Sequence, residues 1–441
     1  MLTDERRSRD GTNKRALRMP YVASLDGLRA VAVLAVLLYH DDLSWIQGGF
    51  LGVEVFFVIS GYLITAILLG KYRDAGTIDL KSFWMGRARR LLPALYLMLG
   101  VVAAWWLLFY PSLVGKLKGQ FLSGSLYFSN WYLAFAKVSY FSHIGRPSPL
   151  IHLWSLAVEE QFYLVWPLIL FGLLRLFKGR PLPLLVSILG AALLSTVTMA
   201  ALYHSGHDPS VVYYGTETRA SGLLVGAALA VVWRPWLARR RPNRRRGVLA
   251  DTAGLAALGL LVIFFLGATE QGAFLYRGGF LLVDLTTALL IAACVTKSNH
   301  VLKVRLGSKP LVWIGQRSYG IYLWHWPIFA VLQPGVLHGV PLFALRLGVT
   351  MVVAAASYRY VEMPFRNGLV RDWLARWRAA GVERQRAFFL RAIGGAAALV
   401  CVVALLVGGV VTHNPGKTQL QVELEQAAKD PANRAGVASD G

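Results

Sequence analysis

The chain has 441 residues, of which 56% are hydrophobic, and its mean hydropathy is +0.50. This composition excludes an ordinary soluble domain and indicates a multi-pass membrane protein. The formal net charge of +23 is typical of some nucleic-acid-binding proteins. Here, however, the positive residues gather at the ends of apolar segments, which indicates membrane orientation and no nucleic-acid partner.

Apolar segments of spanning length predict an all-α protein with eleven transmembrane helices. We expect them at residues 24–42, 50–70, 93–110, 152–174, 182–203, 216–233, 248–267, 279–296, 310–332, 340–358 and 392–412. The aromatic segment 121–136, which Gly124 interrupts, is interpreted as interfacial or re-entrant. The two cysteines, Cys294 and Cys401, both fall within expected helices, so the sequence predicts neither a disulfide framework nor a metal site.

Charge asymmetry orients these helices in the cell membrane. If the N-terminus is inside, most of the 46 lysines and arginines fall in cytoplasmic segments, so the positive-inside rule places the C-terminus outside. The basic run RRRPNRRR (239–246) is then an orientation signal. The predicted divisions are a basic cytoplasmic N-terminus (1–20), a ten-helix membrane domain (21–366), an amphipathic cytoplasmic linker (367–391), an eleventh helix (392–412) and a polar extracytoplasmic tail (413–441).

The first expected helix carries Arg29 and His40, eleven residues apart. At about 100° and 1.5 Å per residue, the two side chains share one face and are separated by about 16 Å, roughly half the hydrocarbon thickness. Charged groups at membrane depth are costly, which favours a functional role for the pair. The alternative is that each side chain extends to its nearer interface.

Further ionisable groups are expected in the outer halves of other helices. They are Glu54, His152, Glu159, Glu160, Arg219, Asp284 and His325. Because such groups cannot face lipid, they predict a water-filled cavity that is open to the outside. Interhelical ion pairs, for example between Arg219 and either Glu54 or Asp284, are the alternative explanation for each single residue.

Seven sequence blocks resemble the acyltransferase family 3 membrane proteins, which O-acylate lipopolysaccharide, peptidoglycan and other glycans. The first, SLDGLRAVAVLAVLLYH (24–40), resembles the Arg-x10-His signature of that family. The others follow in order and extend the resemblance over about residues 20–366: FLGVEVFFVISGYLIT (50–65), FWMGRARRLLPALY (83–96), HLWSLAVEEQFYLVWPL (152–168), TRASGLLVGAALA (218–230), SYGIYLWHWPI (318–328) and YRYVEMPFR (358–366).

The resemblance implies an enzyme that takes an acyl group, acetyl or succinyl, from cytoplasmic acyl-CoA. The acceptor would be a hydroxyl of an extracytoplasmic envelope glycan or glycolipid. Many family members follow an eleventh helix with a soluble SGNH-type domain, whereas this sequence has fewer than thirty residues there. The sequence leaves open whether the protein works alone, is a truncated form, or uses a separate extracytoplasmic transfer partner.

The resemblance and the side-chain chemistry together suggest roles for individual residues. Arg87, Arg89 and Arg90 are expected to bind the CoA phosphates, and Arg29 to guide the donor or polarise its thioester carbonyl. His40 is the candidate general base, or is itself acylated. Glu159 or Glu160 is expected to orient His40. The residues expected to line the acceptor site are Glu54, His152, Tyr163, Arg219, Ser318 and His325.

Two other functional classes remain open. A secondary transporter or flippase also places charges inside a helical bundle, although we find no clear internal repeat between residues 20–180 and 215–360, as many transporters have. An inactive binding or scaffold subunit has no need of such a costly charged set.

Overall fold

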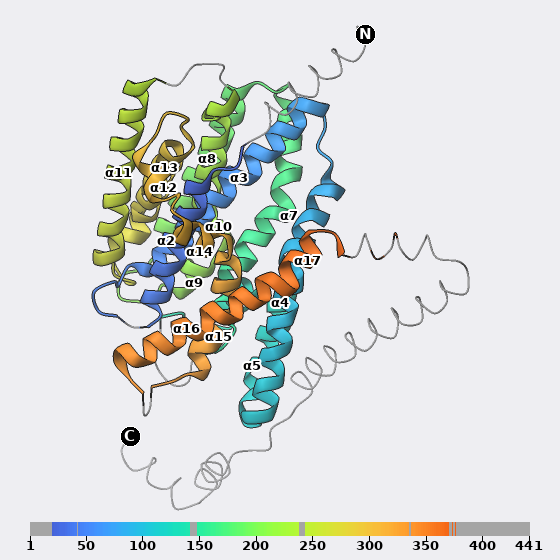
Figure 1. Ribbon diagram of the computed structural model, residues 1–441, viewed down its shortest axis with the longest axis vertical. Coiled ribbons are helices and arrows are strands. Elements are labelled where there is room, and N and C mark those ends of the chain that lie inside the picture. The colour runs from blue at the N-terminus through green and yellow to red at the C-terminus, as the bar shows by residue number, and fades with distance from the viewer. Residues whose placement is uncertain are drawn as a thin grey trace, which may run out of the picture. The chain divides into compact units, whose positions relative to one another are not determined.

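The computed structural model describes residues 20–41, 43–141, 148–237, 243–334 and 337–369, together with residues 373 and 375. All regular structure in these ranges is helical (Figure 1), which confirms the all-α class. The longer elements are α2 (Ala23–Tyr39), α3 (Gly52–Ala75), α4 (Leu80–Phe109), α5 (Pro111–Ser125), α7 (Leu153–Leu176), α8 (Pro181–Leu202), α10 (Thr216–Val232), α11 (Arg244–Gly267), α12 (Phe280–Val295), α15 (Ser318–Val331) and α16 (Gly339–Ser357). The shorter ones are η1 (Gly49–Leu51), α6 (Ser129–Phe135), α9 (Ser210–Tyr214), η2 (Pro235–Leu237), η3 (Leu275–Gly279), α13 (Val301–Arg305), α14 (Lys309–Gln316), η4 (Tyr358–Glu362) and α17 (Met363–Arg366).

The chain divides into two compact units. One consists of residues 1–94 and 126–367, and it contains every candidate site residue predicted from the sequence. The other consists of residues 95–125 and 368–441. In its described part, the end of α4 and α5 are joined by a hydrogen bond of 3.1 Å from the Tyr96 hydroxyl to the Ser125 carbonyl.

Eight helical segments in the described ranges are long and apolar enough to cross a membrane. They are Gly49–Ala75, Leu80–Phe109, Leu153–Leu176, Pro181–Leu202, Thr216–Leu237, Arg244–Gly267, Leu275–Val295 and Gly339–Arg366. They agree with eight of the eleven expected helices and indicate a multi-pass membrane protein. Of the other three, the first is α2, which has 17 residues, and 392–412 lies outside the described ranges.

The remaining expected helix, 310–332, is broken in the structure. α14 ends at Gln316 and α15 begins at Ser318, because Arg317 between them has non-helical angles (φ −102°, ψ 3°). Hydropathy alone could not reveal this break, since apolar residues continue on both sides.

The boundary of α4 also differs from the prediction. The sequence predicts a helix at 93–110 after a basic loop, whereas α4 begins at Leu80 and contains Pro93 within it. The segment before the proline is rich in Leu, Lys, Arg and Met, all good helix formers, so the charged stretch continues the helix. Arg87, Arg89 and Arg90 are therefore fixed on helical turns instead of lying in a loop.

The centre of the larger unit is built from α2, α3, α10 and α12, with α7, α14 and α15 packed around them. Helices α3 and α10 approach at two glycines. A Cβ atom on Gly61 would lie 1.9 Å from the Leu223 carbonyl oxygen, and one on Gly226 would lie 2.1 Å from that of Val58. Small residues at such contacts allow helix backbones to pack closely in a membrane, which holds the polar side chains of both helices in one interior.

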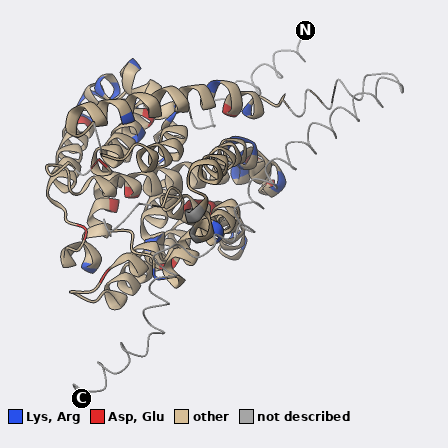
Figure 2. Cartoon of the chain, turned by 90° about the horizontal axis from the view of Figure 1, so that it is seen from below, with Lys and Arg blue, Asp and Glu red and all other residues tan. Residues whose placement is uncertain are grey.

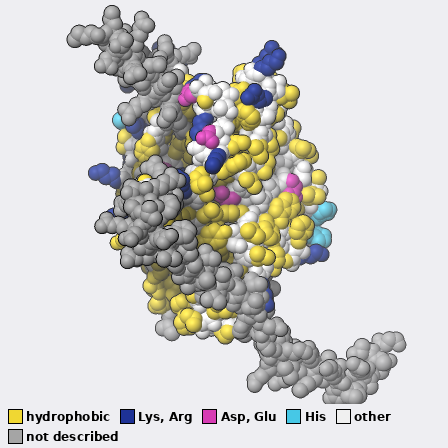
Figure 3. All heavy atoms as spheres, turned by 90° about the vertical axis from the view of Figure 1, so that its right-hand side faces the viewer, with side chains coloured by type: hydrophobic (Ala, Val, Ile, Leu, Met, Phe, Trp, Pro, Cys, Tyr) yellow, Lys and Arg dark blue, Asp and Glu magenta, His cyan; other side chains and the backbone are white. Residues whose placement is uncertain are grey.

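Burial separates the central helices from those that face outwards. In α3, 78% of the apolar window is buried, compared with 33% in α8 and 28% in α11. Among the described residues that are visible in Figure 3, hydrophobic side chains predominate, and Figure 2 shows that acidic and basic residues interrupt only short parts of the helices. Large exposed apolar side chains such as Leu193, Leu194 and Ile263 suit contact with lipid.

Candidate functional site

Helix α2 carries both residues that the sequence analysis placed first. Arg29 lies in its second turn, and His40 follows its last residue and donates its backbone N–H to the Val36 carbonyl at 3.0 Å. Both side chains are mostly covered by neighbouring helices. The pair therefore connects two different environments, here called the histidine cluster (His40, Tyr140, His152, His325 and Trp326) and the arginine cluster (Arg29, Arg87, Arg90, Glu159, Glu160 and Tyr163).

Both ring nitrogens of His40 have hydrogen-bonding partners. Its Nδ1 lies 3.0 Å from Nε2 of His325, and its Nε2 lies 3.0 Å from the Tyr140 hydroxyl. The other nitrogen of His325, Nδ1, lies 2.5 Å from the carbonyl oxygen of Tyr322. The two imidazoles, one from the end of α2 and one from α15, are therefore linked in a fixed chain of contacts.

This chain of contacts determines the tautomers of the neutral rings. A carbonyl oxygen only accepts, so Nδ1 of His325 carries a proton and its Nε2 is an acceptor. His40 must then donate from Nδ1, which leaves the lone pair on its Nε2. That nitrogen accepts from the Tyr140 hydroxyl. The geometry thus identifies Nε2 of His40 as the basic atom of the cluster.

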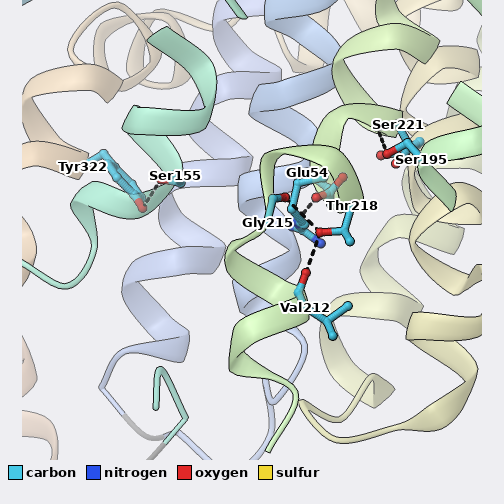
Figure 4. Close-up of polar contacts among 10 residues, drawn as sticks. Glu54, Ser155, Ser195, Val212, Gly215, Thr218, Ser221 and Tyr322 are labelled. Atoms are coloured by element: carbon cyan, nitrogen blue, oxygen red, sulfur yellow. Dashed lines mark hydrogen bonds and ion pairs between the residues drawn. The ribbon is translucent and has the colours of Figure 1, made fainter. Parts of the chain in front are cut away.

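His152 lies behind this pair and helps to join α7 to α15. Its ring is fully buried and 5.6 Å from that of His325, and its Nε2 donates to the Leu323 carbonyl at 3.1 Å. The Tyr322 hydroxyl lies 3.0 Å from the His152 carbonyl and 2.6 Å from Oγ of Ser155, as Figure 4 shows for Ser155 and Tyr322. These bonds restrict how α15 can move and so fix the position of His325.

Two members of the histidine cluster were not predicted from the sequence. Tyr140 lies in an irregular segment, where its backbone N–H donates to Oγ of Ser210 at 2.8 Å. The Trp326 ring is centred 4.6 Å from that of His40, and its indole N–H donates to the Ser148 carbonyl at 2.6 Å. Only the position of Trp326 beside His325 in the block SYGIYLWHWPI could have indicated its role.

The prediction that Glu159 or Glu160 orients His40 is wrong. Among the described residues, the side-chain hydrogen bonds of His40 go to Tyr140 and His325, and neither Glu159 nor Glu160 takes part. Glu159 instead accepts hydrogen bonds from the hydroxyls of Ser60 and Tyr163 through its Oε1. It follows His152 by seven residues, which is a rise of about 10 Å along α7, and this distance removes it from the imidazoles.

Glu159 lies in the arginine cluster. Arg29 is within electrostatic range of Arg90, Asp26 and Glu159, and its nearest carboxylate contact is Asp26 at 3.9 Å. The guanidinium of Arg87 lies over the Tyr163 ring, 4.9 Å from its centroid. Tyr163 was expected on the acceptor side, but its contacts place it here with the arginines.

The remaining predicted residues of this region lie on α4 and α7. Glu160 is within electrostatic range of Glu159, Arg87 and Arg90. Arg89 is half-buried on the same turns of α4. This region therefore combines several guanidiniums with two acidic side chains within electrostatic range of one another.

Glu54 and Arg219 form a separate, fully buried group with Asp284. Arg219 forms an ion pair with Glu54, and both side chains are 1% exposed. The Asp284 carboxylate accepts from the Ser221 hydroxyl at 2.9 Å, and the Arg219 guanidinium lies over the rings of Tyr213 and Phe280 (4.6 and 4.2 Å). Figure 4 shows Glu54 beside Thr218 and Ser221 beside Ser195. This arrangement matches the interhelical ion pair that the sequence left as the alternative.

Ser318 begins α15 and is buried, seven residues before His325. It is therefore about 10 Å from the histidine cluster along the helix axis, and the structure does not bring it to His40. In the described part of the chain, no group of three or more His, Cys, Asp or Glu side chains is arranged to hold a metal ion.

Comparison with known proteins adds independent information. Residues 22–359 match the family model described as "Acyltransferase domain". The peptidoglycan O-acetyltransferase OatA of Listeria monocytogenes is 40% identical over 93% of this chain and 67% of its own length. The O-acetyltransferase OatA of Staphylococcus aureus is 38% identical over 79% of this chain and 57% of its own length.

The chain thus spans between a half and about two thirds of the length of these relatives. No solved structure matches it. Since the family model covers most of the chain and includes Arg29, His40, Glu159 and His325, this protein belongs to the acyltransferase family 3 of membrane proteins.

Proposed function

We propose that the protein is a membrane O-acetyltransferase that takes the acetyl group of acetyl-CoA on the cytoplasmic side and passes it to a hydroxyl of an envelope glycan outside. One observation carries the proposal. A single helix presents Arg29 to a cationic, carboxylate-containing cluster at one end and His40 to a cluster of imidazole and phenol groups at the other. The names of the relatives support acetyl as the group and a cell-wall glycan as the acceptor.

The arginine cluster suits the donor. CoA carries several phosphates, and arginine binds phosphate through paired, charge-assisted hydrogen bonds. Arg87 and Arg90 project from α4 toward this region, and Arg29 stands beside them on α2. Glu159 and Glu160 lie within electrostatic range of these arginines, so the phosphates of an entering donor would compete with them for the guanidiniums.

The histidine cluster suits the acceptor. Nε2 of His40 faces a hydroxyl, that of Tyr140, so the structure already contains the contact that an attacking alcohol needs. The acceptor hydroxyl gives its proton to Nε2, its oxygen forms the new C–O bond, and the C–S bond of the thioester breaks. The departing thiolate then takes the proton from His40. His325 accepts from Nδ1–H and stabilises the positive ring in between.

The separation of the two clusters fits an arm that crosses the membrane. The rise of α2 between Arg29 and His40 is about 16 Å, which is comparable to the phosphopantetheine arm of CoA. With the phosphates held by the arginines, the thioester can approach His40 without the nucleotide entering the membrane. The distribution of Lys and Arg favours an orientation in which the N-terminus lies inside and Arg29 faces the cytoplasm.

The test uses proteoliposomes of the full chain, with labelled acetyl-CoA supplied on one side and a glycan on the other. We expect wild-type protein to place label on the glycan, and His40→Ala to lower the rate by about 10²–10⁴-fold through loss of the base. His338→Ala, which changes an exposed histidine, is the matched control and should transfer normally. Transfer by His40→Ala at the wild-type rate contradicts the assignment, and movement of a solute without covalent label indicates a transporter.

A further inference from the structure

A cavity of about 550 Å³ opens beside the histidine cluster. It is lined by Tyr39, Leu43, Ser44, Gln47, Thr269, Glu270 and Gln271. Tyr39 is the last residue of α2, and the others come from two connections, the one between α2 and η1 and the one between α11 and η3. None of them was singled out from the sequence, and none belongs to either cluster described above.

The two walls of the cavity are fixed to one another. The Gly48 N–H donates to the Phe265 carbonyl at 2.9 Å, and a Cβ atom on Gly48 would lie 2.1 Å from the Phe264 carbonyl oxygen. Across the cavity, the Tyr39 hydroxyl donates to the Glu270 carboxylate at 2.5 Å. The cavity is therefore a built feature of the fold and not a gap between independent loops.

Two stacked tyrosines support the wall of the cavity that is formed by residues 269–271. The rings of Tyr203 and Tyr276 are 4.5 Å apart and almost parallel. Their hydroxyls donate to the backbone carbonyls of Gln271 and Glu270, each at 2.9 Å. Because the backbone is held in this way, the side chains of Glu270 and Gln271 are directed by a fixed support, as a binding site requires.

The lining chemistry limits the ligand. Of the described residues that line the cavity, none is Lys, Arg or His, so the site offers no cation for a phosphate or for CoA. It offers two amides, one carboxylate, three hydroxyls (one of them the phenol of Tyr39) and the aromatic ring of Tyr39. Amides and carboxylates pair with neighbouring hydroxyls, and an aromatic ring packs against an apolar sugar face, so this set suits a neutral, hydroxyl-rich ligand.

Tyr39 links the cavity to the reaction centre. It precedes His40 in the chain, and the centres of their rings are 5.1 Å apart. A ligand that packs against Tyr39 is therefore next to the imidazole. The volume of the cavity is within the usual range for small-ligand sites and is sufficient for a saccharide unit.

We propose that this cavity binds a saccharide unit of the acceptor, with Gln47, Glu270 and Gln271 as hydrogen-bonding residues and Tyr39 as the packing surface. The inference rests on the proposed acetyltransferase function. It assigns a place for the sugar that the two clusters do not provide, and it separates acceptor binding from donor binding.

The test measures KM for acceptor and for donor separately, using full-length protein in proteoliposomes. Two acceptors are compared, a free N-acetylglucosamine tetrasaccharide and a lipid-linked disaccharide. Gln47→Ala combined with Gln271→Ala should raise acceptor KM about tenfold, because two hydrogen bonds are lost, and should leave KM for acetyl-CoA unchanged. Gln333→Ala, an exposed glutamine outside the cavity, is the matched control.

The outcomes distinguish the two proposals. If wild-type protein labels neither acceptor, the acetyltransferase function fails. If it labels them and the double variant keeps the wild-type acceptor KM, the saccharide site alone is overturned. A raised KM for both acceptors, or for only one of them, supports the site and identifies the glycan form that it takes. Glu270→Gln, which keeps the side-chain shape, should also raise acceptor KM and guards against a folding defect in the double variant.

Discussion

The arginine cluster at one end of α2 and the histidine cluster at the other differ in the chemical groups that they bring together. The arginine cluster places the guanidiniums of Arg29, Arg87 and Arg90 within electrostatic range of the side chains of Glu159 and Glu160. The histidine cluster has no carboxylate among the described side chains that contact His40, and relies on neutral hydrogen bonds. One end is suited to holding a charged molecule and the other to moving a proton.

The contrast has a physical basis. An ionised carboxylate beside His40 would favour the charged form of its imidazole, in which neither ring nitrogen has a free lone pair to accept a proton. A second imidazole that is fixed by a carbonyl orients His40 equally well and leaves its Nε2 lone pair available. Substitutions at one end of α2 should therefore alter donor binding and substitutions at the other end should alter proton transfer, each without the other.

The largest effect is expected for His325→Ala. Loss of its Nε2 removes the acceptor for Nδ1–H of His40, so the ring loses both its orientation and the stabilisation of its cationic form. We expect kcat to fall about 100-fold or more, while KM for acetyl-CoA stays within about twofold. Initial rates at varied acetyl-CoA measure both values, and His325→Gln should recover part of the rate. An increase in donor KM alone would place His325 in donor binding.

Much of this contrast could be predicted from the sequence. The spacing of Arg29 and His40 predicted that both lie on one face of a single helix, near its opposite ends, because helical rise and rotation are fixed by the backbone. The family blocks indicated His152 and His325. The buried pair of Glu54 and Arg219 was among the alternatives, since opposite charges at similar depth on adjacent helices tend to meet.

Other features of the site could not be predicted from the sequence. Hydropathy assigns a helix to the membrane but gives its depth only to within a turn or two, and this error placed Glu159 with His40 when Ser60 and Tyr163 are its partners. Tyr140 lies in an irregular segment without periodicity, so no pattern predicted its contact with His40. The break at Arg317 depends on local backbone angles that hydrophobicity does not report.

Arg29→Gln tests the other end of the helix and is expected to have the next largest effect. Loss of one charge-assisted contact to CoA should raise donor KM about 10–100-fold and leave the pH dependence of kcat unchanged. Addition of CoA should also raise the melting temperature of the wild type more than that of the variant. Arg175→Gln, on α7 and outside the cluster, is the control. A fall in kcat without any change in donor KM would contradict the division of labour between the two ends.

Substitutions of Asp41 and Arg346 would show how strongly activity depends on the fixed position of the chain next to His40. Asp41 follows His40 and pairs with Arg346 of α16 at 2.5 Å, and Arg346 also donates to the Leu332 carbonyl at 2.9 Å. Arg346→Gln leaves a buried carboxylate without its partner, so we expect kcat to fall about tenfold and stability to fall as well. The double variant Asp41→Asn with Arg346→Gln should recover part of both losses, because it removes the unpaired charge. Additive losses in the double variant would show that the pair is not a unit.

The smallest effect is expected from Asp208, which supports Tyr140 through Ser210. Its carboxylate accepts from the backbone N–H and the hydroxyl of Ser210, at 2.9 and 2.5 Å, and Ser210 in turn holds the Tyr140 N–H. Burial raises the pKa of the Asp208 carboxyl, but the hydrogen bonds from Ser139 and Ser210 outweigh this and leave the pKa below its ordinary value.

A pKa that is lower in the folded state gives stability that is present above the unfolded value, about 3.9, and is lost as the pH falls through the folded value. The difference in melting temperature between wild type and Asp208→Asn should therefore shrink as the pH is lowered below about 4. The difference should be small throughout, because Asp208 is exposed and solvent screens it. Thermal unfolding in detergent between about pH 3 and 7 measures it. A gap that widens at low pH would show that Asp208 contributes in its protonated form, and that the loop holding Tyr140 against His40 does not depend on this carboxylate.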